Sequence, residues 1–197
     1  MSGIGKVSRP ADTARALLAA GYERLGWPLY RGVPACACTS RPRNCANPGG
    51  RLVGGRQQPV PARALGDHLS RHPDDALLTV CGGRFDTVTL PRDVGSALLV
   101  QLDRQGDAFP ALWSGDRELT LLVRAGSTVA LGELLSERAR AVLRLSSTRT
   151  TLPLPPTHGM AWDTPPWDPA TGTPRPLPSA GALLLPLRST VRLYARG

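Results

Sequence analysis

The chain has 197 residues, of which 41% are hydrophobic, with a formal net charge of +9 and four cysteines. This length suits one compact domain or a domain with a long tail, and the 21 glycines have no three-residue period, which excludes collagen. Blocks of leucine and valine argue against full disorder, and no apolar run approaches the roughly 18 residues of a membrane-spanning helix. Charged residues interrupt the N-terminal alanine and leucine run, so we expect no signal peptide and a cytoplasmic protein with reduced thiols.

Positive charge is unevenly distributed, and arginine supplies nearly all of it. The excess lies in residues 1–60 and 141–197, whereas residues 61–140 carry slightly more acids than bases. No carboxylate occurs between Glu23 and Asp67. Such an arginine-rich segment could bind phosphate groups, but a coding bias that favours arginine everywhere explains the composition equally well.

The first third of the chain is predicted to contain two helices separated by a long loop. Apolar residues at helical spacing indicate a helix over Pro10–Leu25, which Gly26 would end. A short strand is expected at Trp27–Tyr30, and residues 32–59 form a loop rich in cysteine and arginine. The second helix is expected over Val60–Arg71.

The middle of the chain is predicted to alternate strands with helices. Two strands are expected over Ala76–Cys81 and Phe85–Leu90, and the Gly82-Gly83 pair between them is typical of a hairpin turn. A helix over Pro91–Leu102 and a strand over Glu118–Arg124 follow.

An amphipathic helix over Ala130–Leu143 and a strand over Thr150–Leu154 complete this pattern. The alternation predicts an α+β or α/β fold with one central sheet flanked by helices. We therefore expect a flexible N-terminus at residues 1–9, an α/β domain at residues 10–154, and a C-terminal part at residues 155–197 that packs on the same domain.

The C-terminal part is rich in proline. Prolines dominate Pro155–Pro178, where Trp162 and Trp167 also lie, so this segment is expected to be extended. It could dock onto another protein, because proline-rich chain has little conformational entropy left to lose, or its tryptophans could cover the core of the domain itself. For Ala180–Arg196 helix and strand are equally favoured, because Pro186 interrupts an apolar run.

Three of the cysteines are closely spaced in the long loop. Thiolates at Cys36, Cys38 and Cys45 could share a zinc ion, which needs four tetrahedral ligands. No fourth ligand is evident, since the next candidates along the chain are His68 and Cys81. Three reduced thiols without a metal are the main alternative, and a disulfide within the loop is less favoured in a reducing compartment.

Motifs of common catalytic and nucleotide-binding sites do not occur in the sequence. None of the three histidines stands beside a serine or cysteine motif, and the glycine pairs lack the flanking strand and helix of a phosphate-binding loop. The sequence therefore gives little support to nucleophilic catalysis.

Several segments of the chain together indicate a family resemblance. They are the helix ending in Gly26-Trp27-Pro28-Leu29-Tyr30, the loop with Cys36, Cys38, Cys45 and Pro48-Gly49, the strand Phe85-Asp86-Thr87-Val88-Thr89-Leu90-Pro91, the strand before Arg124, and Pro155-Pro156-Thr157 with a following tryptophan. Their order over residues 10–195 resembles the N-terminal domain of bifunctional DNA primase/polymerases (Prim-Pol), in the short form common in actinomycetes. This domain is a branch of the archaeo-eukaryotic primase superfamily.

The resemblance implies an RRM-like sheet and a metal-dependent active site. In the family, two acids one residue apart on a strand, a histidine on a later strand and a third acid hold divalent metals such as Mg²⁺ or Mn²⁺, which align a nucleoside triphosphate with a 3′ hydroxyl. The corresponding positions here are Thr89, Pro91, Leu119 and Thr148, and none carries the expected ligand. Arg51 stands where the loop of the family has a histidine, which weakens the zinc hypothesis.

Asp86 is the acid nearest to the paired positions. Strand side chains alternate, so Asp86 should face away from Thr89 and Pro91. Because Mg²⁺ would have too few charged oxygen ligands, we predict a catalytically degenerate domain without templated synthesis. Such a domain could still bind single-stranded DNA or RNA, or a nucleotide, through four arginines at predicted strand ends, namely Arg84, Arg117, Arg124 and Arg149.

Two other functions stay open. The first is an active metal-dependent nucleotidyltransferase with relocated acids, Asp86 together with Asp116 or Asp163, and with Mg²⁺ or Mn²⁺ as cofactor. The second is a non-enzymatic regulatory module that binds a protein partner through Pro155–Pro178.

Overall fold

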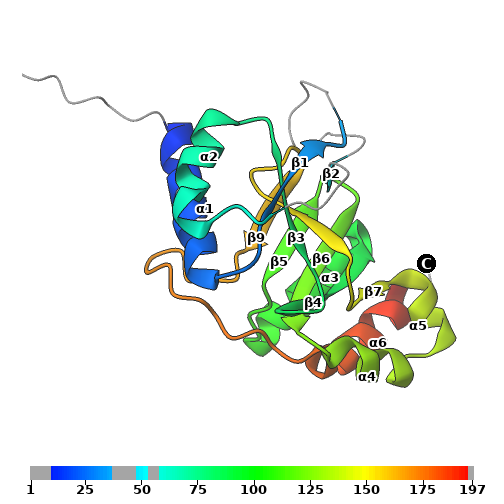
Figure 1. Ribbon diagram of the computed structural model, residues 1–197. Coiled ribbons are helices and arrows are strands. Elements are labelled where there is room, and N and C mark those ends of the chain that lie inside the picture. Colours follow the sequence, from blue (N-terminus) through cyan, green and yellow to red (C-terminus); the bar gives the residue numbers. More distant parts are fainter. Residues whose placement is uncertain (1–9, 37–47, 53–57, 195–197) are drawn as a thin grey trace, which may run out of the picture.

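The structure, a computed structural model, describes residues 10–36, 48–52 and 58–194 (Figure 1). Within these residues the chain forms six α-helices and two antiparallel sheets. The α+β class expected from the sequence is confirmed, whereas the expectation of one central sheet is wrong. None of the described helices is long and apolar enough to cross a membrane.

The smaller sheet has four strands in the order β2-β1-β3-β8, and all neighbouring strands are antiparallel. The strands are β1 (Tyr30–Pro34), β2 (Gly50–Leu52), β3 (Ala76–Val80) and β8 (Thr151–Leu154). Two helices, α1 (Pro10–Leu25) and α2 (Leu65–Arg71), pack against each other on one side of this sheet (Figure 1).

The larger sheet has five strands in the order β7-β4-β6-β5-β9. The strands are β4 (Phe85–Pro91), β5 (Ala111–Ser114), β6 (Glu118–Arg124), β7 (Arg144–Ser146) and β9 (Met160–Thr164). The remaining helices are α3 (Arg92–Gln105), α4 (Ser127–Leu134), α5 (Glu137–Val142) and α6 (Leu184–Tyr194). These four helices cover one face of the larger sheet.

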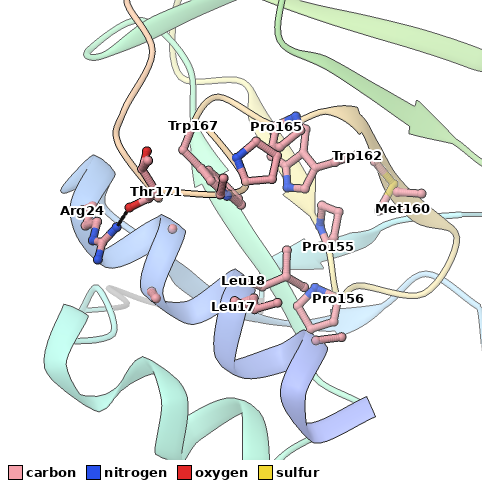
Figure 2. A pocket seen from close by; sticks show the side chains of 17 residues that line it. Leu17, Leu18, Arg24, Pro155, Pro156, Met160, Trp162, Pro165, Trp167 and Thr171 are labelled. Atoms are coloured by element: carbon pink, nitrogen blue, oxygen red, sulfur yellow. Dashed lines mark hydrogen bonds between the residues drawn. The ribbon is translucent and has the colours of Figure 1, made fainter. Parts of the chain in front are cut away.

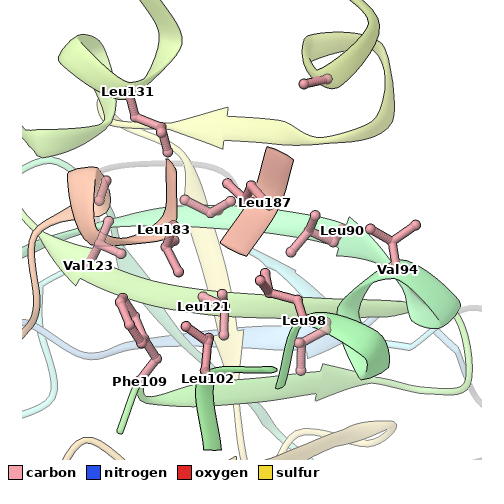
Figure 3. Close-up of a cluster of buried hydrophobic side chains, with 14 of the residues drawn as sticks. Leu90, Val94, Leu98, Leu102, Phe109, Leu121, Val123, Leu131, Leu183 and Leu187 are labelled. Atoms are coloured by element: carbon pink, nitrogen blue, oxygen red, sulfur yellow. The ribbon is translucent and has the colours of Figure 1, made fainter. Parts of the chain in front are cut away.

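One hydrophobic core fills the space between the larger sheet and its helices (Figure 3). Leu90 of β4 and Leu121 of β6 point to this side, where they meet Leu98 of α3 and Leu187 of α6. All four side chains are at most 1% exposed. Full burial of a leucine side chain contributes roughly 1.5–3 kcal/mol, so this core stabilises the association of sheet and helices.

A second hydrophobic core joins the two sheets. Phe85, Leu112 and Leu122 lie on the other face of the larger sheet and pack with Leu77 and Leu154 of the smaller sheet. Helices α1 and α2 contribute the remaining side of this core. The larger sheet is therefore covered by apolar residues on both faces.

The predicted hairpin at Gly82-Gly83 is wrong. Strand β3 pairs with β1 and β8, whereas β4 pairs with β6 and β7, so the two glycines lead the chain from one sheet to the other. Gly82 has φ +96°, and a Cβ at this position would overlap the backbone of Ser147. Gly82 therefore permits a close approach of two loops, and the strands take their partners from distant parts of the chain.

Two predictions for the N-terminal region need correction. The strand expected at Trp27–Tyr30 begins only at Tyr30, because Trp27 and Leu29 are buried in the second core without pairing in a sheet. Part of β1 and all of β2 lie in the segment 32–59 that is predicted as a loop.

The helix predicted over Ala130–Leu143 is in fact two helices, α4 and α5. Leu135 is extended between them, and the Ser136 side chain caps α5 by accepting a hydrogen bond from the Ala139 backbone N–H at 3.3 Å. Serine competes with the helical backbone in this way, so it favours a helix start over a helix interior.

The C-terminal part runs across the molecule (Figure 1). Strand β9 pairs with β5 at the edge of the larger sheet, and the following chain passes α1 before it reaches α6. The last apolar segment is a helix rather than a strand. Pro186 lies in the first turn of α6, where its missing N–H and fixed φ are tolerated.

Candidate functional site

The candidate site begins with β4, whose side chains alternate between two faces. Val88 and Leu90 point into the first core, and Thr89 points to the opposite face. There the Thr89 hydroxyl forms a 3.0 Å hydrogen bond with the hydroxyl of Thr120 on β6. The two residues are only 6% and 5% exposed. The position expected to hold a metal-binding acid is a buried, neutral hydroxyl that already has a partner.

The strands around this threonine pair carry one carboxylate, that of Glu118, and an arginine neutralises its charge. Thr89 stands opposite Arg144 of β7, and Pro91 stands opposite Glu118 of β6. Arg144 Nη2 lies 3.1 Å from Glu118 Oε2 in an exposed ion pair. Mg²⁺ and Mn²⁺ prefer several anionic oxygens, so these residues do not fit a divalent metal. In residues 10–36, 48–52 and 58–194 no group of three or more histidine, cysteine or acidic side chains can hold one.

Asp86 lies on the helix side of β4, which confirms that it faces away from Thr89 and Pro91. It is fully buried, and its Oδ2 accepts hydrogen bonds from the Thr128 hydroxyl at 2.7 Å and the Thr128 backbone N–H at 3.3 Å. Thr128 stands in the first turn of α4, where backbone N–H groups lack helical acceptors. Within the described chain Asp86 Oδ1 has no hydrogen-bond partner. Asp86 therefore anchors a helix and does not replace the missing acids.

The other positions implied by the resemblance do not join Thr89. Leu119 points into the first core and packs so closely on α3 that a Cβ at Gly95 would lie 2.6 Å from it. Thr148 is exposed in the loop after β7. Thr120, one residue beyond Leu119, lies on the Thr89 face instead. Glu118 and Thr120 are polar and two residues apart in an apolar strand, a pattern that could have identified this face from the sequence.

The relocated acids of the alternative hypothesis, Asp116 and Asp163, are far from Asp86. Asp163 lies on β9, three strands from β4 at about 4.8 Å per strand. Asp86 stands opposite Val123, near one end of the β4–β6 ladder. The other end of the ladder is the pair of Pro91 and Glu118, and Asp116 lies beyond it, in the turn before β6. Five residues along a strand span about 17 Å, at roughly 3.4 Å per residue. Asp86 and Asp116 therefore cannot share a metal ion.

Asp116 and Asp163 do line one cavity, of about 330 Å³. Asp116 forms an ion pair with Arg92, and Asp163 accepts a 3.1 Å hydrogen bond from the indole N–H of Trp113. Both carboxylates thus have partners of their own, and no third ligand accompanies them among the described residues.

The structure describes one of the three cysteines of the zinc hypothesis. Cys36 is half-buried, whereas Cys38 and Cys45 lie outside the described residues. Cys81 is buried in the second core, 4.0 Å from the Thr87 hydroxyl. Burial raises the pKa of the Cys81 thiol to about 11, so it stays protonated at neutral pH.

Three of the four candidate arginines gather at one end of the larger sheet. Arg84 precedes β4, Arg124 stands opposite Phe85 at the end of β6, and Arg149 lies in the loop between β7 and β8. All three are exposed, and within the part of the chain that the structure describes none forms an ion pair. Arg117 lies at the opposite end of the sheet, roughly 20 Å away at the usual rise of a strand.

The loop that carries Arg149 is held against the turn before β4. The Cys81 backbone N–H donates to Thr150 O at 2.9 Å, and the backbone of Thr148 would lie 3.0 Å from a Cβ at Gly82. Arg149 itself has φ +47°, alone among the described non-glycine residues. This conformation costs roughly 1–2 kcal/mol, and residues kept in such conformations concentrate at binding sites.

Comparisons of the chain with protein families, with curated proteins and with solved structures find no match.

Proposed function

We propose that this protein is a catalytically degenerate primase/polymerase-like domain that binds single-stranded nucleic acid without extending it. The larger sheet supports the family part of this proposal. Its elements follow the chain as β4-α3-β5-β6-α4-α5-β7, and four of its strands stand in the order β7-β4-β6-β5. This order matches the β-α-β-β-α-β arrangement expected of an RRM-like sheet, and it supports the resemblance for that reason.

The hydrogen bond between Thr89 and Thr120 carries the catalytic part of the proposal. Phosphoryl transfer needs metal ions to neutralise the charge that develops on the phosphate oxygens. Two buried hydroxyls that satisfy each other neither bind such ions nor offer access to a triphosphate. The domain is therefore expected to lack nucleotidyltransferase activity.

Arg84, Arg124 and Arg149 support the binding part. Guanidinium groups bind phosphate oxygens in a bidentate manner, and three of them at neighbouring loops and strand ends can follow a phosphate backbone. For a single strand each phosphate contact contributes about −0.7 to the slope of log affinity against log salt. Three contacts predict a loss of affinity of about 15- to 20-fold between 50 and 200 mM salt.

Fluorescence anisotropy with a short labelled single-stranded oligonucleotide tests this binding. We expect Arg84→Gln, Arg124→Gln and Arg149→Gln each to weaken binding and to reduce the salt slope by about 0.7. Arg117→Gln is the matched control, because this residue lies at the other end of the sheet and should leave both values unchanged. An affinity that does not vary with salt would contradict the proposal.

Primer extension with Mg²⁺ or Mn²⁺ tests the absence of activity. We expect no product at protein concentrations that saturate the oligonucleotide. A metal-dependent product that disappears in Asp163→Asn would instead support the active nucleotidyltransferase, since Asp116 and Asp163 share a cavity.

A further inference from the structure

A cavity of about 640 Å³ lies between α1 and residues 155–172, a segment that we call the strap (Figure 2). Its volume falls in the range of roughly 300–1,000 Å³ that is typical of small-molecule sites. The lining is mainly apolar and includes Leu17, Leu18, Pro155, Pro156, Trp162 and Trp167. Leu17 remains 62% exposed at its edge.

One end of the strap is fixed to α1 by hydrogen bonds. The Tyr22 hydroxyl donates to Pro155 O at 2.6 Å and accepts from Trp162 Nε1 at 3.1 Å. Tyr22 is 1% exposed, and its burial raises the pKa of the phenol, so the hydroxyl keeps the proton that it donates.

The middle and the far end of the strap are fixed as well. The Trp167 indole rests on Gly21, where a Cβ would overlap it, and its ring is 5.3 Å from that of Tyr22. Farther along, the Arg24 guanidinium donates to Thr171 O. Figure 2 shows this contact at the end of α1 away from Pro156.

These anchors keep the cavity open. Collapse of the strap onto Leu17 and Leu18 would bury apolar surface, but the strap cannot move toward them while Tyr22, Gly21 and Arg24 hold it. Its prolines have a fixed φ, which reduces the backbone freedom available for a collapse. The cavity is therefore preformed, and a ligand would bind without paying to order the strap.

The charge of the lining limits what this ligand can be. Arg24 is the only charged side chain among the described residues that line the cavity. Its guanidinium has five N–H donors, of which the bond to Thr171 O uses one nitrogen. An apolar cavity with a single cation at one end is complementary to an apolar molecule with a single anionic group.

We propose that the cavity under the strap binds a compact aromatic ligand that carries one carboxylate or sulfonate group. The rings lie beside the strap indoles and against Leu17 and Leu18 of α1, and the anionic group lies at Arg24. This site is separate from the proposed nucleic-acid site, which lies at one end of the larger sheet, so each proposal can fail without the other.

Fluorescence titration of the full chain with two naphthalene probes tests the proposal. The first probe, 1-anilinonaphthalene-8-sulfonate, is anionic, and the second, N-phenyl-1-naphthylamine, is its neutral counterpart. We expect saturable binding of one anionic probe per chain. Arg24→Gln leaves the Tyr22 and Trp167 anchors of the strap in place, so it should weaken the anionic probe about tenfold, equivalent to about 1.4 kcal/mol, and change the neutral probe less than about twofold.

Two matched variants locate the probe. Leu17→Glu places a charge at the edge of the cavity, whereas Val129→Glu makes the same change on α4 at a residue that is 61% exposed. Only Leu17→Glu should abolish binding, and thermal unfolding should show both variants folded. Equal binding by these two variants, or an Arg24→Gln effect that is the same for both probes, would overturn the proposal.

Discussion

Replacement of Asp86 by alanine distinguishes an anchor of α4 from a remnant of a catalytic centre. The substitution removes two hydrogen bonds from Thr128 and leaves its backbone N–H without an acceptor in a buried place. Each bond contributes about 0.5–1.5 kcal/mol, and a buried unsatisfied donor costs about 1–3 kcal/mol. Removal of the unpartnered Oδ1 offsets part of this loss. We expect the free energy of unfolding to fall by about 2–3 kcal/mol.

Thermal and urea unfolding measure this change. For a chain of this length the loss corresponds to a Tm that is lower by about 4–12 °C. Thr128→Val removes the hydroxyl donor but keeps the shape of the side chain, so the double variant should show a coupling of about 1 kcal/mol between the two residues. Asp107→Ala, which removes an exposed acid, should change stability by less than about 0.5 kcal/mol.

Two results would refute the reasoning about Asp86. An alanine variant with unchanged Tm would show that the carboxylate does not anchor α4. Additive effects of Asp86→Ala and Thr128→Val would show that the two residues act independently, despite the 2.7 Å between Asp86 Oδ2 and Thr128 Oγ1.

Three further predictions concern single residues. Because Cys81 is buried with a thiol pKa of about 11, peptide mass spectrometry should find it unmodified by iodoacetamide in the folded protein and modified in urea. Burial and the nearby Arg31 lower the pKa of His68. Asp75, whose Oδ2 lies 3.5 Å from His68 Nε2, opposes this shift but is also paired with Arg31. The unfolded chain therefore binds the proton more tightly, so stability should fall as pH drops below about 6.5, and His68→Gln should flatten that slope in urea titrations at a series of pH values. Gly21→Ala should cost about 1–3 kcal/mol and shift tryptophan emission to longer wavelength, because its Cβ would displace the Trp167 indole; unchanged emission would contradict the packing of the strap.

Features that depend on local backbone geometry follow from the sequence alone. Helix α1 has the predicted bounds Pro10–Leu25, and β6 has the predicted bounds Glu118–Arg124, because helical spacing and apolar strand runs are read from neighbouring residues. Side-chain alternation likewise predicts that Asp86 faces away from Thr89. The absence of acids at Thr89 and Pro91 is a matter of residue identity, which needs no structure.

Features that depend on distant contacts required the tertiary structure. The hairpin signal at Gly82-Gly83 is local, but the partners of β3 and β4 are β8 and β6, which come much later in the chain. Short strands such as β5 and β7 carry too few residues for a periodic pattern.

The candidate sites likewise depend on local residue identity and on contacts between distant parts of the chain. The sequence identifies the arginines and the tryptophans as residues of interest, but not which of them lie together. Sheet register brings Arg84 and Arg124 to one end and Arg117 to the other. Hydrogen bonds between α1 and a segment more than a hundred residues later keep the strap cavity open, as the Tyr22 to Pro155 bond shows. Local patterns determine the elements, and long-range packing decides which of their side chains share a site.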